Sequence, residues 1–152
     1  SMLYVKTKIK ESPIHGIGLF ADEFIKKGTV IWKFTPGFDI KFTGEQILEL
    51  PELAQIHLAK YSWKSKKSGM YCHSSDDGKF FNHSENQNCF SEYTDSEEEV
   101  VVVALSDIQV GDEITDNYSS FEDIEYNNIL IDIHKKYNLV DELDPRMKME
   151  TI

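Results

Sequence analysis

The sequence predicts a mostly β protein folded as a single domain. Several short segments have strand patterns, few have helical ones, and strands do not alternate with helices as in a doubly wound parallel sheet. The chain has 152 residues, 40% of them hydrophobic, which is enough to form one core of its own. We therefore expect several short-stranded sheets with a few short helices between them.

Four segments have the composition of strands: residues 3–10, 29–34, 100–105 and 114–118. The first alternates apolar side chains with lysines and a tyrosine, which is the period of a half-buried strand. The second is rich in β-branched and aromatic residues, the third is an apolar run typical of a buried strand, and the fourth follows a Gly-Asp turn. We expect a strand in each segment.

Two short helices, or one broken pair, are expected between Thr43 and Tyr61. Thr43 and Gln46 form a candidate capping box, and Pro51 suits the first turn of the second helix. The acidic run 92–99 precedes the apolar third strand, and we expect it to be a solvated hairpin tip.

A third helix is expected near the C-terminus. Ser120 and Asp123 have the spacing of a capping box and precede apolar residues at helical spacing, which predicts an amphipathic helix over residues 121–137. Residues 141–152 lose this periodicity and are expected to form a flexible tail, so the domain is expected to span residues 3–140.

Charge and hydropathy exclude several classes of function. The net charge of −11 disfavours direct binding to a nucleic-acid backbone and favours basic partners. The longest apolar run, residues 100–105, is far shorter than the roughly 18 residues of a membrane span. The N-terminus lacks the hydrophobic stretch of a secretory signal. We expect an intracellular protein that contacts no membrane, with nuclear or cytoplasmic location left open.

Glycines at positions 16 and 18 have two interpretations. The segment from Gly16 to Ala21 satisfies G-x-G-x-x-A, but Gly28 begins a new strand only seven positions after Ala21, too soon for the parallel crossover of a dinucleotide site. The glycines either permit positive φ in a tight turn or let the backbone approach a ligand closely.

The two cysteines do not indicate a disulfide framework or a metal site. Cys72, His73, His83 and Cys89 lack the spacings typical of zinc ligands. We expect buried, reduced thiols and no bound metal.

Four sequence blocks occur in a distinctive order: HGIGLFA (15–21), IKKGTVI (25–31), FFNHS (80–84) and IQVGDEITDNY (108–118). Together they resemble the SET-domain protein-lysine methyltransferases, over roughly residues 3–121. The resemblance implies a SET fold, with a knot-like C-terminal segment, short inserted helices and a C-terminal helix. It also implies methyl transfer from S-adenosyl-L-methionine to a lysine side chain in a protein substrate.

The resemblance assigns roles to individual residues. It implies that the cofactor is bound by His15, Gly16, Ile17, Gly18, Asn82 and His83, with Phe121 packing on the adenine. Tyr118 corresponds to the active-site tyrosine, and Tyr61 to a residue lining the lysine channel. Asn82, His83 and Tyr118 should then be neighbours. Taken alone, the Asn-His pair equally suits a turn cap, and Phe121 equally suits the core.

Some positions depart from the family pattern. Glu85 and Gln87 stand where relatives usually have Cys and Pro, and no cysteine follows Cys89, so we expect a compact member without pre-SET and post-SET zinc modules. Asp116 stands where many relatives have an aromatic or apolar residue that influences how many methyl groups are added. A carboxylate there could hold a protonated amine or accept its proton.

The expected partner is a lysine-containing basic protein or peptide, such as a histone tail, drawn to the acidic surface. A homodimer is a further expectation, because compact members of the family can dimerise. The alternative function is a SET-like peptide-binding module with weak or no catalysis.

Overall fold

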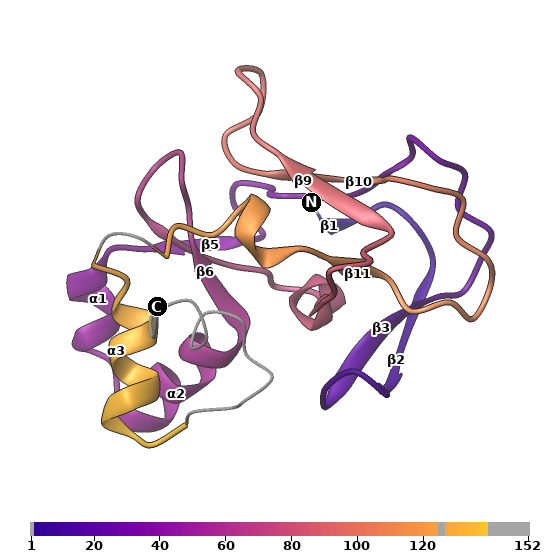
Figure 1. Cartoon of the computed structure of the whole chain (residues 1–152). Helices are drawn as coiled ribbons and strands as arrows, with labels where there is room; N and C mark the ends of the chain where they lie inside the picture. Colours follow the sequence, from indigo (N-terminus) through magenta and orange to yellow (C-terminus); the bar gives the residue numbers. More distant parts are fainter. Residues whose placement is uncertain (1, 125–126, 140–152) are drawn as a thin grey trace.

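The computed structural model describes residues 2–124 and 127–139, in which short strands form four small sheets and three α-helices gather at one end (Figure 1). The strands are β1 (Met2–Leu3), β2 (Thr7–Glu11), β3 (Ile17–Ala21), β4 (Val30–Lys33), β5 (Ile40–Phe42), β6 (Ser62–Lys64), β7 (Tyr71–His73), β8 (Asn82–His83), β9 (Cys89–Glu92), β10 (Val101–Ala104) and β11 (Thr115–Asp116). The helices are α1 (Gly44–Leu48), α2 (Glu52–Tyr61) and α3 (Ile129–Lys136), with 3-10 turns η1 (Asp77–Phe80) and η2 (Tyr118–Ser120). The mostly β prediction is confirmed. Within the described ranges, no helix has the length and apolar character needed to span a bilayer.

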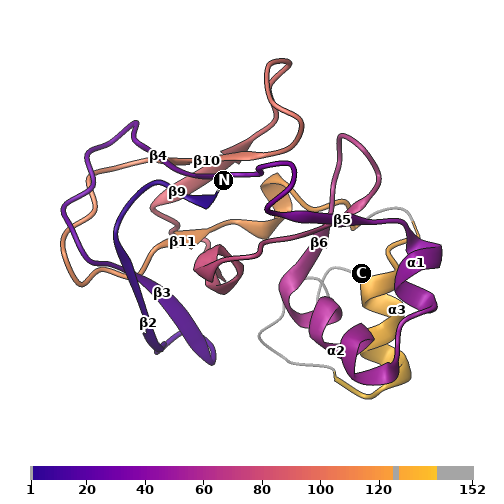
Figure 2. The ribbon, with the colours of Figure 1, turned by 180° about the vertical axis from the view of Figure 1, so that it is seen from behind.

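Two of the sheets form the body of the fold. The antiparallel sheet β1-β4-β10-β9 covers the main core, and the sheet β5-β7-β6 carries the helices. The hairpin β2–β3 lies at the opposite end from the helices in both views (Figure 2). The fourth sheet is the parallel pair of β8 and β11, which joins segments that are distant in the sequence.

Two hydrophobic clusters stabilise this arrangement. The larger one contains Leu19, Ile25, Ile31, Trp32, Phe34, Val102, Ile108 and Ile114 among its buried residues. The smaller one contains Ile47, Leu58, Ala59, Tyr71, Leu130 and Ile133 and fixes the helices on their sheet. Cys72 and Cys89 are fully buried free thiols in the larger cluster, as predicted. Burial raises the pKa of both thiols, which keeps them protonated.

The prediction of one continuous strand over residues 3–10 is wrong. The chain leaves the main sheet after Leu3, and β2 pairs instead with β3. The break is at Lys6, whose N–H donates to the Glu23 carboxylate (2.6 Å) and whose carbonyl accepts from Asp22 N (2.9 Å). Alternating polarity specifies an extended chain but not which strand it pairs with, so it cannot reveal this exchange of partners.

The two helices expected between Thr43 and Tyr61 are confirmed. The Thr43 hydroxyl accepts from Gln46 N (3.1 Å), and the Gln46 side-chain oxygen accepts from Thr43 N (2.9 Å), which completes the capping box. Pro51 is the N-cap of α2 and so lies one position before the predicted first turn.

The C-terminal helix begins later than predicted. Its N-cap is Asn128, whose side chain accepts from Leu130 N (3.0 Å). The residues that should have formed the first turns are bound elsewhere: Asp123 N donates to Lys64 O (2.9 Å), and Glu122 is buried beside Asn128. These long-range contacts outweigh the local helical pattern. The predicted tail, 141–152, lies outside the described residues.

The acidic segment 92–99 connects β9 to β10 as the predicted hairpin, but it is not solvated throughout. Glu99 is 0% exposed, where its carboxylate contacts Lys41 Nζ (2.9 Å) and accepts from the Ser65 hydroxyl (2.5 Å). Lys41 in turn lies in β5, so this buried ion pair fastens the hairpin to the second sheet.

Candidate functional site

The parallel pairing of β8 with β11 brings the third and fourth sequence blocks together. Thr115 lies opposite Asn82, and Asp116 lies opposite His83. Tyr118 N donates to His83 Nδ1 (3.1 Å), and the two rings are 5.4 Å apart, edge to face. The prediction that Asn82, His83 and Tyr118 are neighbours is confirmed. This arrangement is the knot-like element of the fold.

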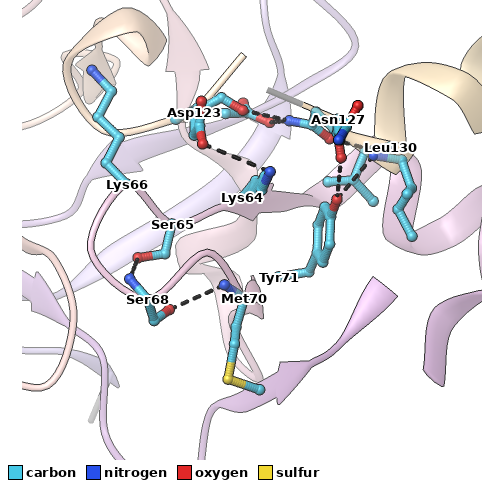
Figure 3. Close-up of polar contacts among 12 residues, drawn as sticks. Lys64, Ser65, Lys66, Ser68, Met70, Tyr71, Asp123, Asn127 and Leu130 are labelled. Carbon is cyan, nitrogen blue, oxygen red and sulfur yellow. Dashed lines mark hydrogen bonds and ion pairs between the residues drawn. The ribbon is translucent and has the colours of Figure 1, made fainter. Parts of the chain in front are cut away.

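The segment after β11 is then fastened to the β6–β7 hairpin (Figure 3). Asp123 contacts Lys64 Nζ at 3.7 Å. The Tyr71 hydroxyl donates to Asn127 O (3.0 Å) and accepts from Ile129 N (2.9 Å), just before and at the start of α3. These contacts hold the C-terminal segment across the earlier chain, so that Tyr118 is fixed from both sides.

The two glycines of the first block serve different purposes. Gly16 has φ +47°, and a Cβ there would meet nothing within 4 Å. Gly18 does not have positive φ, but a Cβ there would lie 2.5 Å from Glu113 Oε2 and 2.9 Å from Ser12 Cβ. The positive-φ interpretation therefore holds for Gly16 and is wrong for Gly18, which is a site of close approach to Glu113.

Asn82 holds the glycine loop in place. Its side-chain nitrogen donates to His15 O (3.0 Å), to Ile17 O (3.3 Å) and to Glu113 Oε2 (2.9 Å), and the residue is only 7% exposed. His15, Gly16 and Ile17 are themselves exposed. The side-chain nitrogen of Asn82 therefore holds the shape of the loop. A direct contact of Asn82 with a cofactor stays a prediction.

Glu113 is a site residue that the sequence did not single out. Both of its carboxylate oxygens accept from the Ser12 hydroxyl (2.7 and 2.9 Å), and one also accepts from Asn82. It lies within the fourth block, but only the contact geometry shows that it anchors the glycine loop. Asn82 and Glu113 therefore act together as positioning residues for that loop.

A pocket lies beside the β8–β11 pair. Its lining includes the aromatic residues Trp32, Tyr61, Trp63, Phe81, Tyr118 and Phe121, together with Lys60, Lys79, Ser91, Asp116 and Glu122. The structure thus brings the predicted residues Tyr61, Tyr118 and Phe121 into one wall. No described residue of the glycine loop lines this pocket. The lining residue Phe81 is followed in the sequence by Asn82, whose side chain donates hydrogen bonds to the loop.

The aromatic walls are held rigidly. The Tyr118 hydroxyl donates to Phe81 O (2.6 Å), and its ring packs on Phe121 at 5.6 Å. Phe121 also packs on Trp63 at 5.9 Å and adjoins the main core, so its core interpretation fits the structure and contact with an adenine ring stays a prediction. The indole N–H groups of Trp32 and Trp63 are buried without a hydrogen-bond partner among the described residues.

Asp116 is a buried carboxylate in this wall, only 2% exposed. Its oxygens accept hydrogen bonds from the Ser91 hydroxyl and from Asn117 N (2.7 Å). Burial raises the pKa of Asp116 to about 6, and these two hydrogen bonds oppose that rise. No pattern in the sequence marks Ser91 as its partner.

Two histidines lie behind Tyr61. His57 is 5.0 Å from the Tyr61 ring and 5.4 Å from the His73 ring, and His73 Nδ1 lies 2.9 Å from the Ser62 hydroxyl. Burial, with smaller contributions from His57 and Lys79, lowers the pKa of His73 to about 4. Burial, followed by nearby lysines, also lowers the pKa of His57. Both rings are therefore neutral at pH 7, and they add no positive charge behind Tyr61.

Within residues 2–124 and 127–139, no group of three or more His, Cys, Asp or Glu side chains is arranged to hold a metal ion. The described polar groups of the site are hydroxyls, the carboxylates of Asp116 and Glu122, the amines of Lys60 and Lys79, indole N–H groups and exposed loop backbone.

Comparisons with known proteins agree on one family. The sequence model of the SET domain matches residues 16–119. A candidate histone methyltransferase from Plasmodium falciparum has a similar structure, with a TM-score of 0.54 and 27% identity over 76% of this chain and 95% of that one. No curated protein gives a significant sequence match.

Two larger structures share the fold. A humanized mutant of Chaetomium thermophilum Polycomb Repressive Complex 2 has a TM-score of 0.56 and 22% identity over 78% of this chain and 16% of that one. The ctPRC2 complex bound to S-adenosylmethionine has a TM-score of 0.57 and 18% identity over 88% of this chain and 17% of that one. This chain therefore corresponds to about one sixth of each of those chains.

Proposed function

This chain belongs to the SET-domain family, and from that premise we propose that it transfers a methyl group from S-adenosyl-L-methionine to the side-chain amine of a lysine in a protein substrate. The observation that carries the proposal is the pocket that both Tyr61 and Tyr118 line, beside the Asn82-His83 pair. The relatedness to a candidate histone methyltransferase supports the same reaction.

The pocket suits a lysine side chain. Aromatic rings can pack along the aliphatic stem, and the two tyrosine hydroxyls can orient the amine. A free lysine has a pKa of about 10.4, so that neutralising it at pH 7 costs roughly 4.6 kcal/mol. The aromatic rings of the pocket disfavour the charged amine and reduce this cost, whereas the Asp116 and Glu122 carboxylates in the lining favour the charged form. His57 and His73 are neutral and lie behind Tyr61, so we assign the orientation and deprotonation of the amine to the tyrosines and Asp116.

The donor groups also fit a sulfonium cofactor. An aromatic wall attracts cations through the faces of its rings, and the exposed backbone of the glycine loop offers hydrogen-bonding groups for polar parts of a ligand. His15, Gly16, Ile17, Gly18 and His83 are the residues that we assign to cofactor binding, with Asn82 shaping the loop and Phe121 near the adenine. The bound cofactor supplies an electrophilic methyl group, and the chain orients the amine toward it.

We assign the substrate to the class of lysine-rich basic proteins, with histones as the first example. The net charge of −11 attracts such segments over a distance of about 8 Å at physiological salt. An intracellular location and a homodimer belong to the same proposal, and light scattering tests the second.

The second candidate is a peptide-binding module with weak or no catalysis. Asp116 favours it, because a buried carboxylate beside Tyr118 could bind a protonated amine so firmly that methyl transfer becomes slow.

One assay separates the two candidates. Labelled methyl from S-adenosylmethionine is offered to mixed histones and to a crude protein extract, with Tyr118→Phe as the control. Label that enters a protein and is lost in the variant supports the enzyme. Thermal stabilisation by the cofactor without any label supports the binding module, and no stabilisation at saturating cofactor contradicts the proposed function.

A further inference from the structure

Asp116 carries a charge that the described part of the protein does not balance. Each of its carboxylate oxygens accepts one hydrogen bond, from Ser91 and Asn117, and can accept another. No cation among the described residues forms an ion pair with it. Asp side chains this deeply buried are almost always paired, so the carboxylate is a site prepared for a cation.

The groups around Asp116 do not supply that cation. The titratable groups on the elements packed against it and in the pocket wall are His83, Cys89, Glu92, Tyr118, Tyr61, Lys60, Lys79 and Glu122. Neither lysine forms an ion pair with Asp116: Lys60 is exposed, and Lys79 Nζ lies 5.8 Å from the centre of the Phe80 ring. His83 is engaged by Tyr118 N through Nδ1, and Cys89 is a buried thiol that stays protonated. Glu122 is a second buried carboxylate, with a hydrogen bond from Asn128 (3.2 Å).

The shape and chemistry of the pocket define the missing cation. The aromatic rings of Tyr61, Tyr118 and Phe121 line the space in which Asp116 is found, so the ligand must combine an apolar stem with a cationic end. A primary ammonium has three donors, which suits a carboxylate with two free acceptor positions and a nearby tyrosine hydroxyl. A lysine side chain meets each of these requirements.

We propose that Asp116 receives the target lysine: its carboxylate binds the ammonium group inside the pocket and accepts the proton that the amine must lose. The inference rests on the proposed function and names the residue that selects a basic side chain for it. In this step a proton passes from lysine Nζ to an Asp116 oxygen, and the N–H electron pair remains on nitrogen as a lone pair. A neutral amine and a carboxylic acid result, and the acid returns its proton to water when the product leaves.

Burial affects the proton affinity of both groups. Burial brings the pKa of Asp116 up to about 6, while the apolar wall lowers that of an inserted lysine. Burial therefore narrows the difference in proton affinity between the separate groups, whereas the ion pair that forms first favours both charged forms and opposes the transfer.

A titration without cofactor tests the binding step. The protein is labelled with carboxyl-¹³C aspartate, the Asp116 signal is identified by its loss in Asp116→Asn, and n-butylammonium chloride serves as the probe. The ammonium should lower the titration midpoint of Asp116 by about 1 to 3 pH units. Butanol at the same concentration should not change it. An unchanged midpoint with saturating n-butylammonium overturns the proposal.

Glu122 provides the matched variant. If Asp116 is the receptor, Glu122→Gln retains the shift of the Asp116 signal. If n-butylammonium instead binds to Glu122, Glu122→Gln abolishes the shift of the Asp116 signal, and the assignment to Asp116 is wrong. Asp39→Asn, a buried carboxylate outside the pocket, controls for the loss of a buried charge.

Methyl transfer provides the second readout. Asp116→Asn should reduce kcat/KM for histones at least tenfold and remove the rise of kcat/KM with pH near pH 6, with cofactor affinity unchanged. Asp116→Glu should restore part of kcat/KM and part of its pH dependence. A pH profile identical to that of the parent protein contradicts the proposal. Should the parent protein transfer no methyl at all, the proposed function fails, and the carboxylate titration still decides whether Asp116 binds a cationic amine.

Discussion

The main-chain N–H of Tyr118 donates a hydrogen bond to Nδ1 of His83, a residue 35 positions earlier in the chain. This contact, with the bond from the Tyr118 hydroxyl to Phe81 O, orients the tyrosine with respect to the segment that carries Asn82. The candidate site is therefore one structural unit assembled from two distant blocks.

Tyr118→Phe should remove most turnover and leave cofactor binding nearly intact. The ring still packs on Phe121, but the hydroxyl that orients the amine is lost. Loss of one positioned polar group costs about 100-fold in kcat. Labelled methyl transfer measures turnover, and calorimetric titration with S-adenosylmethionine measures binding. Equal loss of both would mean that Tyr118 is structural.

Asn82→Ala should weaken cofactor binding at least about tenfold and destabilise the fold by about 1–3 kcal/mol, because His15 O, Ile17 O and Glu113 lose their shared donor. Faster hydrogen exchange in the glycine loop would accompany the change. Unaltered affinity with a loosened loop would show that the loop does not bind the cofactor.

Gly18→Ala and Gly16→Ala should differ in their effects. The methyl group at position 18 meets Glu113 and Ser12 and must displace them, at a cost of about 1–3 kcal/mol. The methyl group at position 16 meets open space, so that only positive φ opposes it, at about 1 kcal/mol. Urea unfolding measures both, and a larger cost at position 16 would contradict this account.

Asp116 should make the free energy of unfolding depend on pH. Its pKa is about 6 in the folded protein and near 3.8 in the unfolded chain, so between these values only the folded state holds the proton. Stability therefore falls as pH rises from about 4 to 6 and is flat above. Asp116→Asn should remove that slope and add up to about 3 kcal/mol at pH 7.

His73 should give a slope of opposite sign over a similar range. Its folded pKa is about 4, against 6.5 when unfolded, so the unfolded state binds the extra proton and stability rises with pH in this window. The two slopes oppose each other in the parent protein. Denaturation at pH 4.5 to 7.5 should therefore show a clear rise of stability with pH only in Asp116→Asn. If the stability of this variant does not change with pH, the assignment to His73 is wrong. If its pH profile matches that of the parent protein, the assignment to Asp116 is wrong.

Lys41→Met should destabilise the protein by about 3–5 kcal/mol, because it leaves Glu99 buried without its cation. Burial alone would lower the pKa of Lys41, but its bonds to Glu99 and Glu98 outweigh burial and raise it. Lys33→Met is the matched control at the more exposed pair with Glu97, where a much smaller loss is expected because solvent screens the pair. Similar losses in both variants would mean that Glu99 finds another partner.

Local patterns predicted those parts of the fold that depend on neighbouring residues. The capping box of Thr43 with Gln46 and the apolar strand near Val102 needed no distant partner to be recognised. The start of α3 could not be predicted in this way, because Glu122 and Asp123 are held by contacts with residues far away in the sequence.

In the candidate site, too, the residues within local sequence blocks could be predicted, and the contacts between distant segments could not. Sequence blocks identified Tyr118, Asn82 and the glycines, because those residue types recur at fixed spacing. The anchoring by Glu113 and the bond from Ser91 to Asp116 join segments with no common local pattern. Such contacts are determined by topology, and a single sequence does not encode topology in any short window.

The parallel pairing of Asn82 with Thr115 also constrains the order of folding. Antiparallel neighbours such as β9 and β10 can form as a local hairpin, whereas β8 must wait until β11 has been synthesised and the loop between them has closed. We therefore expect a slow final phase in refolding, during which secondary structure is largely complete but Tyr118 has not yet formed its hydrogen bond with His83. Chains released before residue 115 is synthesised would contain the strands of the other three sheets but not the β8–β11 pair, which places Asp116 in the pocket lining.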